Sequence, residues 1–151
     1  MFRADTVPEM SDAPPDPNDF NRKIIEEFRA NDGVVGPPFE GAPMVLLNHI
    51  GAKSGTPRTS PLVYTRDGDR YVIIASKGGA PNHPDWYHNV KANPRVTLEV
   101  GADTFEADAE VLDSGPERDR LYDQMADAMP NFRGYQENTD RVIPVVVLTP
   151  A

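Results

Sequence analysis

The sequence predicts an α+β protein in which about six mostly antiparallel strands form a small β-barrel with helices packed outside it. Three observations support this fold class. Most of the strand-like segments follow one another through tight turns, and strands joined in this way pair antiparallel. Closing such a sheet into a barrel removes its exposed edges. Regular strand–helix alternation and a G-x-G-x-x-G motif are both absent, which disfavours a doubly wound Rossmann sheet.

The first residues differ in composition from the rest of the chain. Residues 1–16 are polar, proline-rich and aperiodic, so we expect a flexible N-terminal tail. Residues 17–151 have the length and apolar content of one globular domain. The sequence therefore predicts a tail followed by a single domain.

The domain is expected to begin with an amphipathic helix. Pro17 suits the first helical position, and the Asn31-Asp32-Gly33 segment ends the helix. Phe20, Ile24 and Phe28 recur every four residues and give the helix one apolar face. We expect this face to pack on the sheet, and contact with a membrane surface or a partner protein is the alternative.

The predicted strands are short segments that are either continuously apolar or alternate between apolar and polar residues. They span residues 44–50, 59–65, 70–76, 95–100, 104–112 and 142–148.

Two further helices are expected between these strands. A short helix should begin at Pro84 and end before Pro94. The Ser114-Gly115-Pro116-Glu117 segment matches a capping box and predicts the start of the other.

Composition and charge exclude several classes of protein. The chain has no cysteine, so disulfides, thiolate catalysis and cysteine-ligated metals are excluded. A net charge of −9 argues against a nucleic-acid partner. We find neither an apolar run of membrane-spanning length nor the apolar region of a secretory signal, and we expect a cytoplasmic protein. Association with a membrane through the first helix is the alternative left open.

The middle of this acidic chain is locally basic. Residues 51–98 carry seven bases and three acids, a net charge of +4. Within them, Lys53 and Arg58 flank a Ser54-Gly55-Thr56-Pro57 turn that contains no acid. Such a turn can offer two cations, two hydroxyls and backbone amides to one anion, such as a phosphate. A plain hairpin with exposed bases is the alternative interpretation, and the spacing is not that of a Walker A loop.

A second segment, residues 75–89, also has the composition of a ligand site. Gly78 and Gly79 follow a buried strand and would let a ligand approach the backbone closely. Trp86, the single tryptophan, could form a wall for a planar ring. A structural role for Trp86 in the core is the alternative. A third segment, residues 129–135, follows a helix interrupted by a proline, and it either overhangs a pocket or connects into the last strand.

Metal binding and hydrolytic catalysis are both disfavoured. His83 and His88 lie five residues apart, which is not the i, i+4 spacing of a helical metal site, and we predict no metal. A G-x-S-x-G motif is absent. The many carboxylates of residues 99–140 fit a solvated surface better than a catalytic pair.

Three motifs together resemble the deazaflavin-dependent nitroreductase family, whose coenzyme is F420. They are G-x-K-S-G-x-x-R-x-x-P-L at residues 51–62, ASKGGAPNHPDWYHNVKANP at residues 75–94 and TDRVIPVVVL at residues 139–148. The resemblance covers roughly residues 20–150 and implies a split β-barrel of the flavin-binding type.

The resemblance also implies roles for individual residues. Catalytic roles fall to Ser76 and Tyr135, as the groups that could supply a proton, with a bound water as another source. Met129, Phe132 and Tyr135 would line the substrate pocket; similar proteins have tyrosines at all three positions. This pocket is therefore more apolar and suits a bulky fused-ring substrate. The residues implied to bind the coenzyme are Ala52, Lys53, Ser54, Arg58, Thr59, Ser60, Pro61, Leu62, Val63, Ile74, Ala75, Ser76, Lys77, Asp85, Trp86, Tyr87, His88 and Asn89.

The function implied is hydride transfer from reduced coenzyme F420 to an electrophilic small molecule such as a quinone, an enone, an unsaturated lactone or a nitroaromatic. Two alternatives stay open: an oxidoreductase of the same fold that binds FMN, and a non-catalytic deazaflavin carrier. We expect a monomer or a weak dimer.

Overall fold

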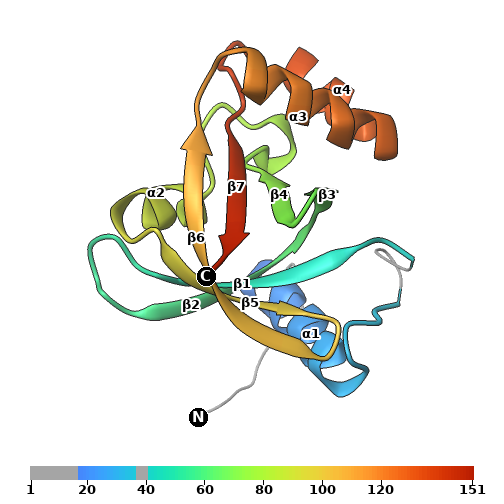
Figure 1. The fold of residues 1–151 in the computed structure, drawn as a ribbon, viewed down its shortest axis with the longest axis vertical. Helices are drawn as coiled ribbons and strands as arrows, with labels where there is room; N and C mark the ends of the chain where they lie inside the picture. The colour runs from blue at the N-terminus through green and yellow to red at the C-terminus, as the bar shows by residue number, and fades with distance from the viewer. Residues whose placement is uncertain (1–16, 37–40) are drawn as a thin grey trace, which may run out of the picture.

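The computed structural model describes residues 17–36 and 41–151, and the predicted flexible tail, residues 1–16, lies outside the described residues (Figure 1). The helices are α1 (Pro17–Ala30), the short 3₁₀-helix η1 (Lys77–Gly79), α2 (Asp85–Ala92), α3 (Pro116–Ala128) and α4 (Asn131–Glu137). The strands are β1 (Met44–Ile50), β2 (Pro57–Val63), β3 (Thr65–Asp67), β4 (Arg70–Ile74), β5 (Arg95–Val100), β6 (Asp103–Leu112) and β7 (Val145–Pro150).

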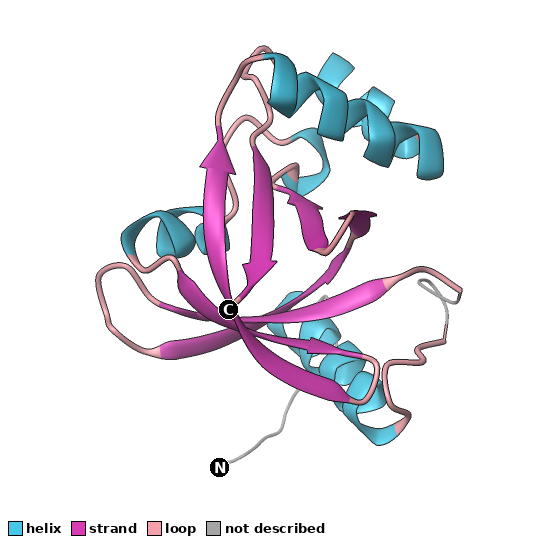
Figure 2. Ribbon diagram, viewed as in Figure 1, coloured by secondary structure: helices cyan, strands magenta, loops and turns pink. Residues whose placement is uncertain are grey.

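The strands form one curled antiparallel sheet, which confirms the predicted α+β split barrel. Its order is β2-β1-β5-β6-β7-β4-β3, with antiparallel pairing throughout (Figure 2). The two edge strands, β2 and β3, are consecutive in the chain and are separated by Tyr64 alone. Since one residue joins the two edges, the sheet must curl until these edges approach each other.

Side-chain alternation explains why the central strands are apolar along their whole length. In β1, Val45 and Leu47 enter the core inside the curled sheet, whereas Met44 and Leu46 pack under α1. The strands β4 and β7 are covered in the same manner, by the inner core on one face and by α3 and α4 on the other. A strand covered on both faces needs apolar side chains at every position.

The helix α1 packs on the sheet as expected. Ile24 and Phe28 are buried against Met44 and Leu46 of β1. The Arg29 guanidinium adds a bidentate ion pair to Glu99 of β5, with nitrogen–oxygen distances of 3.0 and 2.7 Å. The sheet therefore covers the apolar face of α1 at Ile24 and Phe28, whereas Phe20, the third residue of the predicted face, is 43% exposed. Among the described residues, no helix has the length and apolar character needed to cross a membrane.

Several element boundaries differ from the sequence-based prediction. The strand predicted over residues 59–65 is two strands, because the chain passes from one sheet edge to the other at Tyr64. The last strand begins at Val145 rather than at Val142, because the segment before it is turned toward α3 by a hydrogen bond from Arg118 Nε to Ile143 O (2.9 Å).

Two predictions about the helices also differ from the structure. The predicted capping box was wrong: Gly115 is the N-cap residue of α3, with no side-chain cap, and Pro116 starts the helix. The helix α4 was not predicted; Pro130 precedes it as its N-cap residue.

We expect Phe28→Ala to lower the free energy of unfolding by about 3–5 kcal/mol, because it opens a cavity between α1 and the sheet. The measurement is urea denaturation followed by circular dichroism. Val34→Ala is the control: its side chain is 69% exposed, so a change within about 0.5 kcal/mol is expected. Equal effects of the two substitutions would contradict the packing described for α1.

Candidate functional site

Three adjoining cavities form a groove along β2 and α2. The loop cavity, of 500 Å³, is lined by Gly51–Ser54, Arg58, Asp85, His88 and Asn89. The middle cavity, of 590 Å³, lies between α1 and β2 and includes Thr59, Ser60, Asp85 and Trp86. The apolar cavity, of 230 Å³, is lined mainly by Pro61–Val63, Ile74, Ser76, Trp86, Phe132 and Tyr135. Arg58 and Asp85 are common to the first two cavities, and Trp86 is common to the last two.

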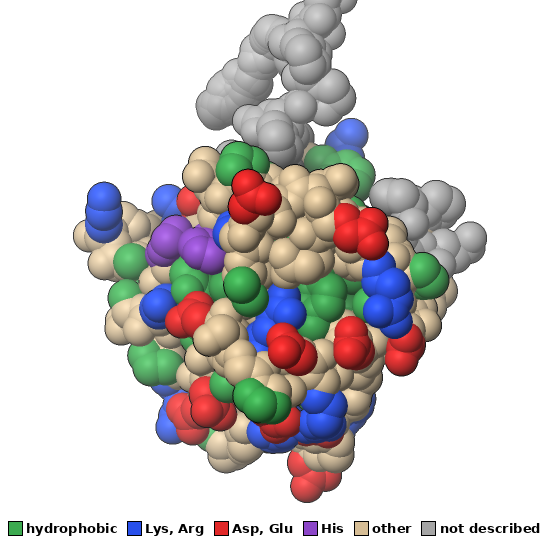
Figure 3. All heavy atoms as spheres, turned by 90° about the horizontal axis from the view of Figure 1, so that it is seen from above, with side chains coloured by type: hydrophobic (Ala, Val, Ile, Leu, Met, Phe, Trp, Pro, Cys, Tyr) green, Lys and Arg blue, Asp and Glu red, His purple; other side chains and the backbone are tan. Residues whose placement is uncertain are grey.

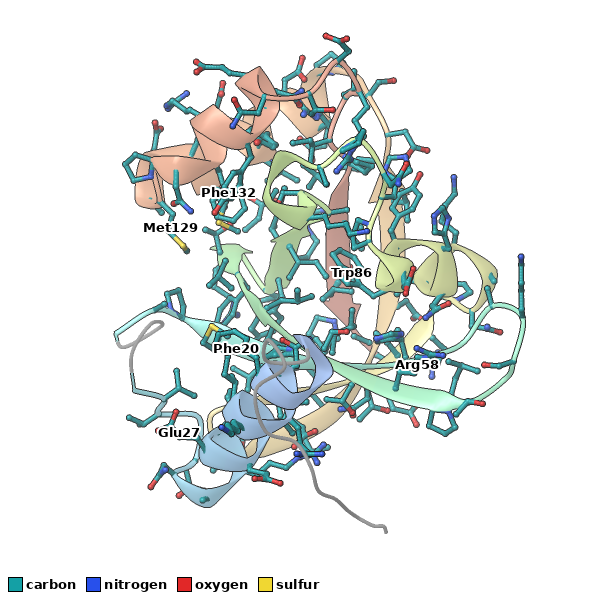
Figure 4. All side chains as sticks on the ribbon, turned by 180° about the vertical axis from the view of Figure 1, so that it is seen from behind. Phe20, Glu27, Arg58, Trp86, Met129 and Phe132 are labelled. Carbon is teal, nitrogen blue, oxygen red and sulfur yellow. The ribbon has the colours of Figure 1, made fainter. Side chains whose placement is uncertain are left out.

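The edge strand β2 determines the polarity of this groove. Its residues line the three cavities in chain order, from Arg58 in the loop cavity, through Thr59 and Ser60, to Pro61–Val63 in the apolar cavity. Arg58, Trp86 and Phe132 follow one another along the groove in Figure 4. One strand thus leads from a cationic, polar end to an apolar end.

The basic loop between β1 and β2 is a tight turn that leaves two backbone amides available. Gly51 N donates to Thr56 O (2.9 Å) and Gly55 N to Gly51 O (3.0 Å). A Cβ on Gly51 would lie 2.4 Å from Ser54 Oγ, so a side chain there would displace the Ser54 hydroxyl. Ala52 N donates to Asn89 Oδ1 (2.8 Å). The amides of Lys53 and Ser54 have no acceptor among the residues that the structure describes.

Three cations of the groove differ from most other cations of the described residues in having no carboxylate partner. Arg70, Arg95, Arg120 and Arg133, which line none of the three cavities, each form an ion pair with a carboxylate, and so does Arg29 at the middle cavity. On the face shown in Figure 3, acidic and basic side chains lie intermingled. Within residues 17–36 and 41–151, by contrast, no carboxylate pairs with Lys53, Arg58 or Lys77, all of which line the groove. Lys53 and Arg58 both line the loop cavity and form a candidate site for an anion there, whereas Lys77 lines the apolar cavity.

A buried histidine underlies the middle of the groove. His49 of β1 is 3% exposed, and its ring nitrogens contact Ser60 Oγ (2.9 Å) and Asn89 Nδ2 (3.0 Å). Burial, followed by the nearby Arg58 guanidinium, lowers the pKa of His49 to about 4, while the Asp85 carboxylate opposes this shift. The imidazole is therefore neutral at physiological pH.

The loop after β4 carries a strained residue and an unpartnered hydroxyl. Lys77 has a φ of +48°, which costs energy for any residue but glycine and tends to occur at functional sites. Arg141 holds this loop, donating to Ser76 O (2.8 Å) and Ala80 O (2.9 Å). Ser76 is 8% exposed and lines the apolar cavity. In the described part of the chain, its hydroxyl has no hydrogen-bond partner.

The helix α4 contacts this loop and borders the apolar cavity with Phe132 and Tyr135. The Tyr122 hydroxyl donates to Phe132 O, and Arg118 Nη2 donates to Gln136 Oε1 (2.6 Å), so α4 is fastened to α3. Gly79 has a φ of +85°, and a Cβ there would lie 2.8 Å from Tyr135 O. The absence of a side chain at Gly79 thus lets η1 contact α4.

The structure brings most of the predicted site residues to the groove, but not all of them. The side chain of Tyr87 turns away and donates to Asp113, and Ala75 is fully buried in the inner core. Met129 packs against the core beneath α3 and lines none of the three cavities. Gly79 was expected to let a ligand approach the backbone, but the backbone of Tyr135 in α4 lies there instead. Sequence reasoning missed the roles of His49 and Arg141, because a single histidine or arginine gives no signal until tertiary contacts show its neighbours.

Comparison with solved structures gives the class of protein to which this fold and groove belong. A solved F420-H2 dependent reductase matches with a TM-score of 0.65 and 42% identity, covering 70% of this chain and 93% of that one. A solved domain-swapped dimer matches with a TM-score of 0.66 and 38% identity, covering 88% and 99%. The fold is thus that of the split-barrel reductases.

The chain belongs to the F420H(2)-dependent quinone reductase family, whose model matches residues 20–150. It is 47% identical over 125 residues to an F420H(2)-dependent quinone reductase of Mycobacterium tuberculosis, covering 81% of this chain and 84% of the relative. The resemblance found in the three motifs is therefore confirmed, and so are the predictions of an oxidoreductase and of coenzyme F420 as its cofactor.

We expect Gly79→Ala to destabilise the protein more than Gly68→Ala. Both glycines have positive φ angles, which cost alanine about 1–2 kcal/mol. Only at position 79 would the added Cβ clash with the backbone of α4, since nothing lies within 4 Å at position 68. Urea denaturation of both variants gives the comparison, and equal losses of stability would mean that η1 and α4 do not make this contact.

Proposed function

We propose that this protein binds reduced coenzyme F420 in the groove and catalyses hydride transfer from it to a quinone or a similar electrophile. The observation that carries the proposal is the polarity of the groove. Its unpaired cations suit the anionic end of the coenzyme, and its apolar end suits a ring system. Family membership supplies the identity of the coenzyme.

The residues present fit the charged part of such a coenzyme. Lys53 and Arg58 would hold its phosphate and the start of its lactyl-glutamate tail, together with the free amides of Lys53 and Ser54. The Ala52 amide, which the sequence resemblance also implied, already donates to Asn89. Asn89 and His88 would border the coenzyme at the loop cavity.

The ring would lie between β2 and α2. Thr59 to Val63 form one side, Trp86 and Asp85 the other, and Ile74, Ser76 and Lys77 the inner end. Any contact from Ala75 or Tyr87 would have to come from the backbone, because both side chains point elsewhere. The coenzyme supplies a hydride when it is bound, and the protein must hold the acceptor about 3–3.5 Å from the donating carbon.

A proton must reach the oxygen of the acceptor as negative charge develops there. The Ser76 hydroxyl is the better placed donor, because it is buried, lines the apolar cavity and has no other acceptor in the described residues. The Tyr135 oxygen accepts a hydrogen bond from Asn131 Nδ2 (2.7 Å), so its own proton is also available. We assign the role to Ser76 or a water bound to it, ahead of Tyr135.

The acceptor class follows from the wall of the apolar cavity. Phe132 is 6% exposed and packs edge-on against Tyr135, with ring centroids 5.1 Å apart. This surface suits fused-ring quinones, enones and unsaturated lactones better than small polar nitro compounds. Ile24 and Phe28 of α1 are buried on the sheet and only Phe20 of its apolar face is exposed, so we do not place a membrane contact there. We propose a cytoplasmic protein that is a monomer or a weak dimer.

Titration of the purified protein with F420 and with FMN tests the proposal, because Trp86 is the single tryptophan and lies in the groove. We expect quenching of its fluorescence by F420 and oxidation of F420H2 when menadione is added. Tight binding of FMN without a response to F420 would favour the FMN enzyme, and F420 binding without turnover of any quinone would favour a carrier.

The double variant Lys53→Ala/Arg58→Ala should raise the Kd for F420 by about 100-fold or more, because two charge-assisted contacts are lost at roughly 1.5–3 kcal/mol each. Arg120→Ala/Arg133→Ala removes the same charge from α3 and α4 and should leave the Kd nearly unchanged. Fluorescence titration measures both constants. A similar Kd for the two double variants would refute the proposed role of the basic loop.

Phe132→Tyr should shift acceptor preference toward nitroaromatics, because it adds a hydroxyl to the wall of the apolar cavity. The ratio of kcat/KM for a nitroaromatic and for menadione measures this shift, and the Kd for F420 should not change. Phe105→Tyr, at a half-buried position that packs against the inner core and lines none of the three cavities, is the matched control. An unchanged ratio in Phe132→Tyr would mean that this residue does not contact the acceptor.

A further inference from the structure

The direction of each hydrogen bond around His49 can be deduced from a single backbone amide. Ala52 N–H can only donate, so the atom of Asn89 that it meets at 2.8 Å is the amide oxygen. The NH₂ group of Asn89 therefore faces His49 Nδ1, at 3.0 Å. An NH₂ group has no acceptor capacity, so Nδ1 must accept, and the proton of the neutral imidazole is on Nε2.

The same chain of donors and acceptors orients Ser60. His49 Nε2–H donates to Ser60 Oγ, at 2.9 Å. Because Oγ accepts this bond, the hydroxyl proton must point to another acceptor. The structure shows none for it within residues 17–36 and 41–151, and Ser60 lines the middle cavity between Arg58 and the apolar end. The hydroxyl is thus left as a donor toward the groove.

We propose that His49 is a positioning residue, which holds the Ser60 hydroxyl as a hydrogen-bond donor to an electronegative atom of the coenzyme. The inference rests on the proposed binding of F420 in the groove. It adds a residue of β1 that is 3% exposed and borders the middle cavity, where its two ring nitrogens are already engaged by Ser60 and Asn89. The bonded partners Ala52, Asn89, His49 and Ser60 would couple the conformation of the basic loop to the middle of the groove.

A merely structural role is the competing explanation. His49 also accepts from Asn89, which anchors the basic loop to α2 through Ala52. Two polar substitutions of His49 distinguish its contact with Ser60 from its contact with Asn89. The side-chain amide of asparagine lies at about the position of the histidine Nδ1, and that of glutamine lies at about the position of Nε2. His49→Asn keeps the bond to Asn89 and loses the donor to Ser60. His49→Gln keeps the donor to Ser60 and loses the acceptor for Asn89.

The experiment is titration of each variant with oxidised F420, followed by Trp86 fluorescence, with thermal unfolding measured in parallel. Ser60→Ala should raise the Kd about tenfold, whereas Ser60→Thr, which keeps the hydroxyl, should stay close to the wild type. His49→Asn should raise the Kd more than His49→Gln does. Adding His49→Asn to Ser60→Ala should not weaken F420 binding further, because His49→Asn acts through the Ser60 hydroxyl, which Ser60→Ala has already removed.

Thr65→Val is the control, since it removes a strand hydroxyl that is bonded to Gln124 outside the groove, and its Kd should equal that of the wild type. The inference is overturned if Ser60→Ala and Ser60→Thr bind F420 equally well, a comparison that stands even if the His49 variants fail to fold. It is also overturned if His49→Asn weakens binding as much without the Ser60 hydroxyl as with it. Wild-type protein that shows no response to F420 would instead refute the proposed function, and this inference with it.

Discussion

The groove exists because one residue, Tyr64, joins the two edges of the sheet. Since β2 and β3 are consecutive in the chain yet lie at opposite edges, the sheet must curl, but the two edges do not pair with each other. The strand β2 therefore pairs only with β1 and leaves its other side open. An uncovered edge strand can pair with another chain and so promote aggregation. Here α1 and α2 flank the open edge, and the space that remains is the groove.

Rigid supports surround this open edge. On one side, Asn89 ties α2 to the basic loop, and on the other, Arg141 ties the loop after β4 to the segment before β7. The wall formed by α4 is held by backbone contact with Gly79 and by the buried Arg118. These supports use buried donors and acceptors that are mutually satisfied. The groups that face the groove, among them the Ser76 hydroxyl and the loop amides, remain available for a ligand.

Much of the fold could be predicted because the local sequence patterns favour the same helices and strands that the tertiary packing stabilises. The strands over residues 44–50 and 95–100 have the predicted bounds, since each is a run of strand-forming residues with a clear turn or proline beside it. The prediction was wrong where a long-range contact determined the backbone. Residues 142–144 look like a strand but are turned toward α3 by Arg118, and α4 is a helix because α3 and η1 hold it.

The sequence by itself determined the family, the antiparallel architecture and most of the side chains that line the groove, because motifs and periodicity are local properties of the chain. Only the tertiary structure decided which of those side chains face the groove, turning Tyr87 toward Asp113 and burying Ala75. It alone placed His49 behind Ser60 and left Lys53, Arg58 and Lys77 without carboxylate partners among the described residues. The physical reason is that a hydrogen bond or an ion pair depends on distances across the fold, and residues far apart in sequence carry no local mark of being neighbours.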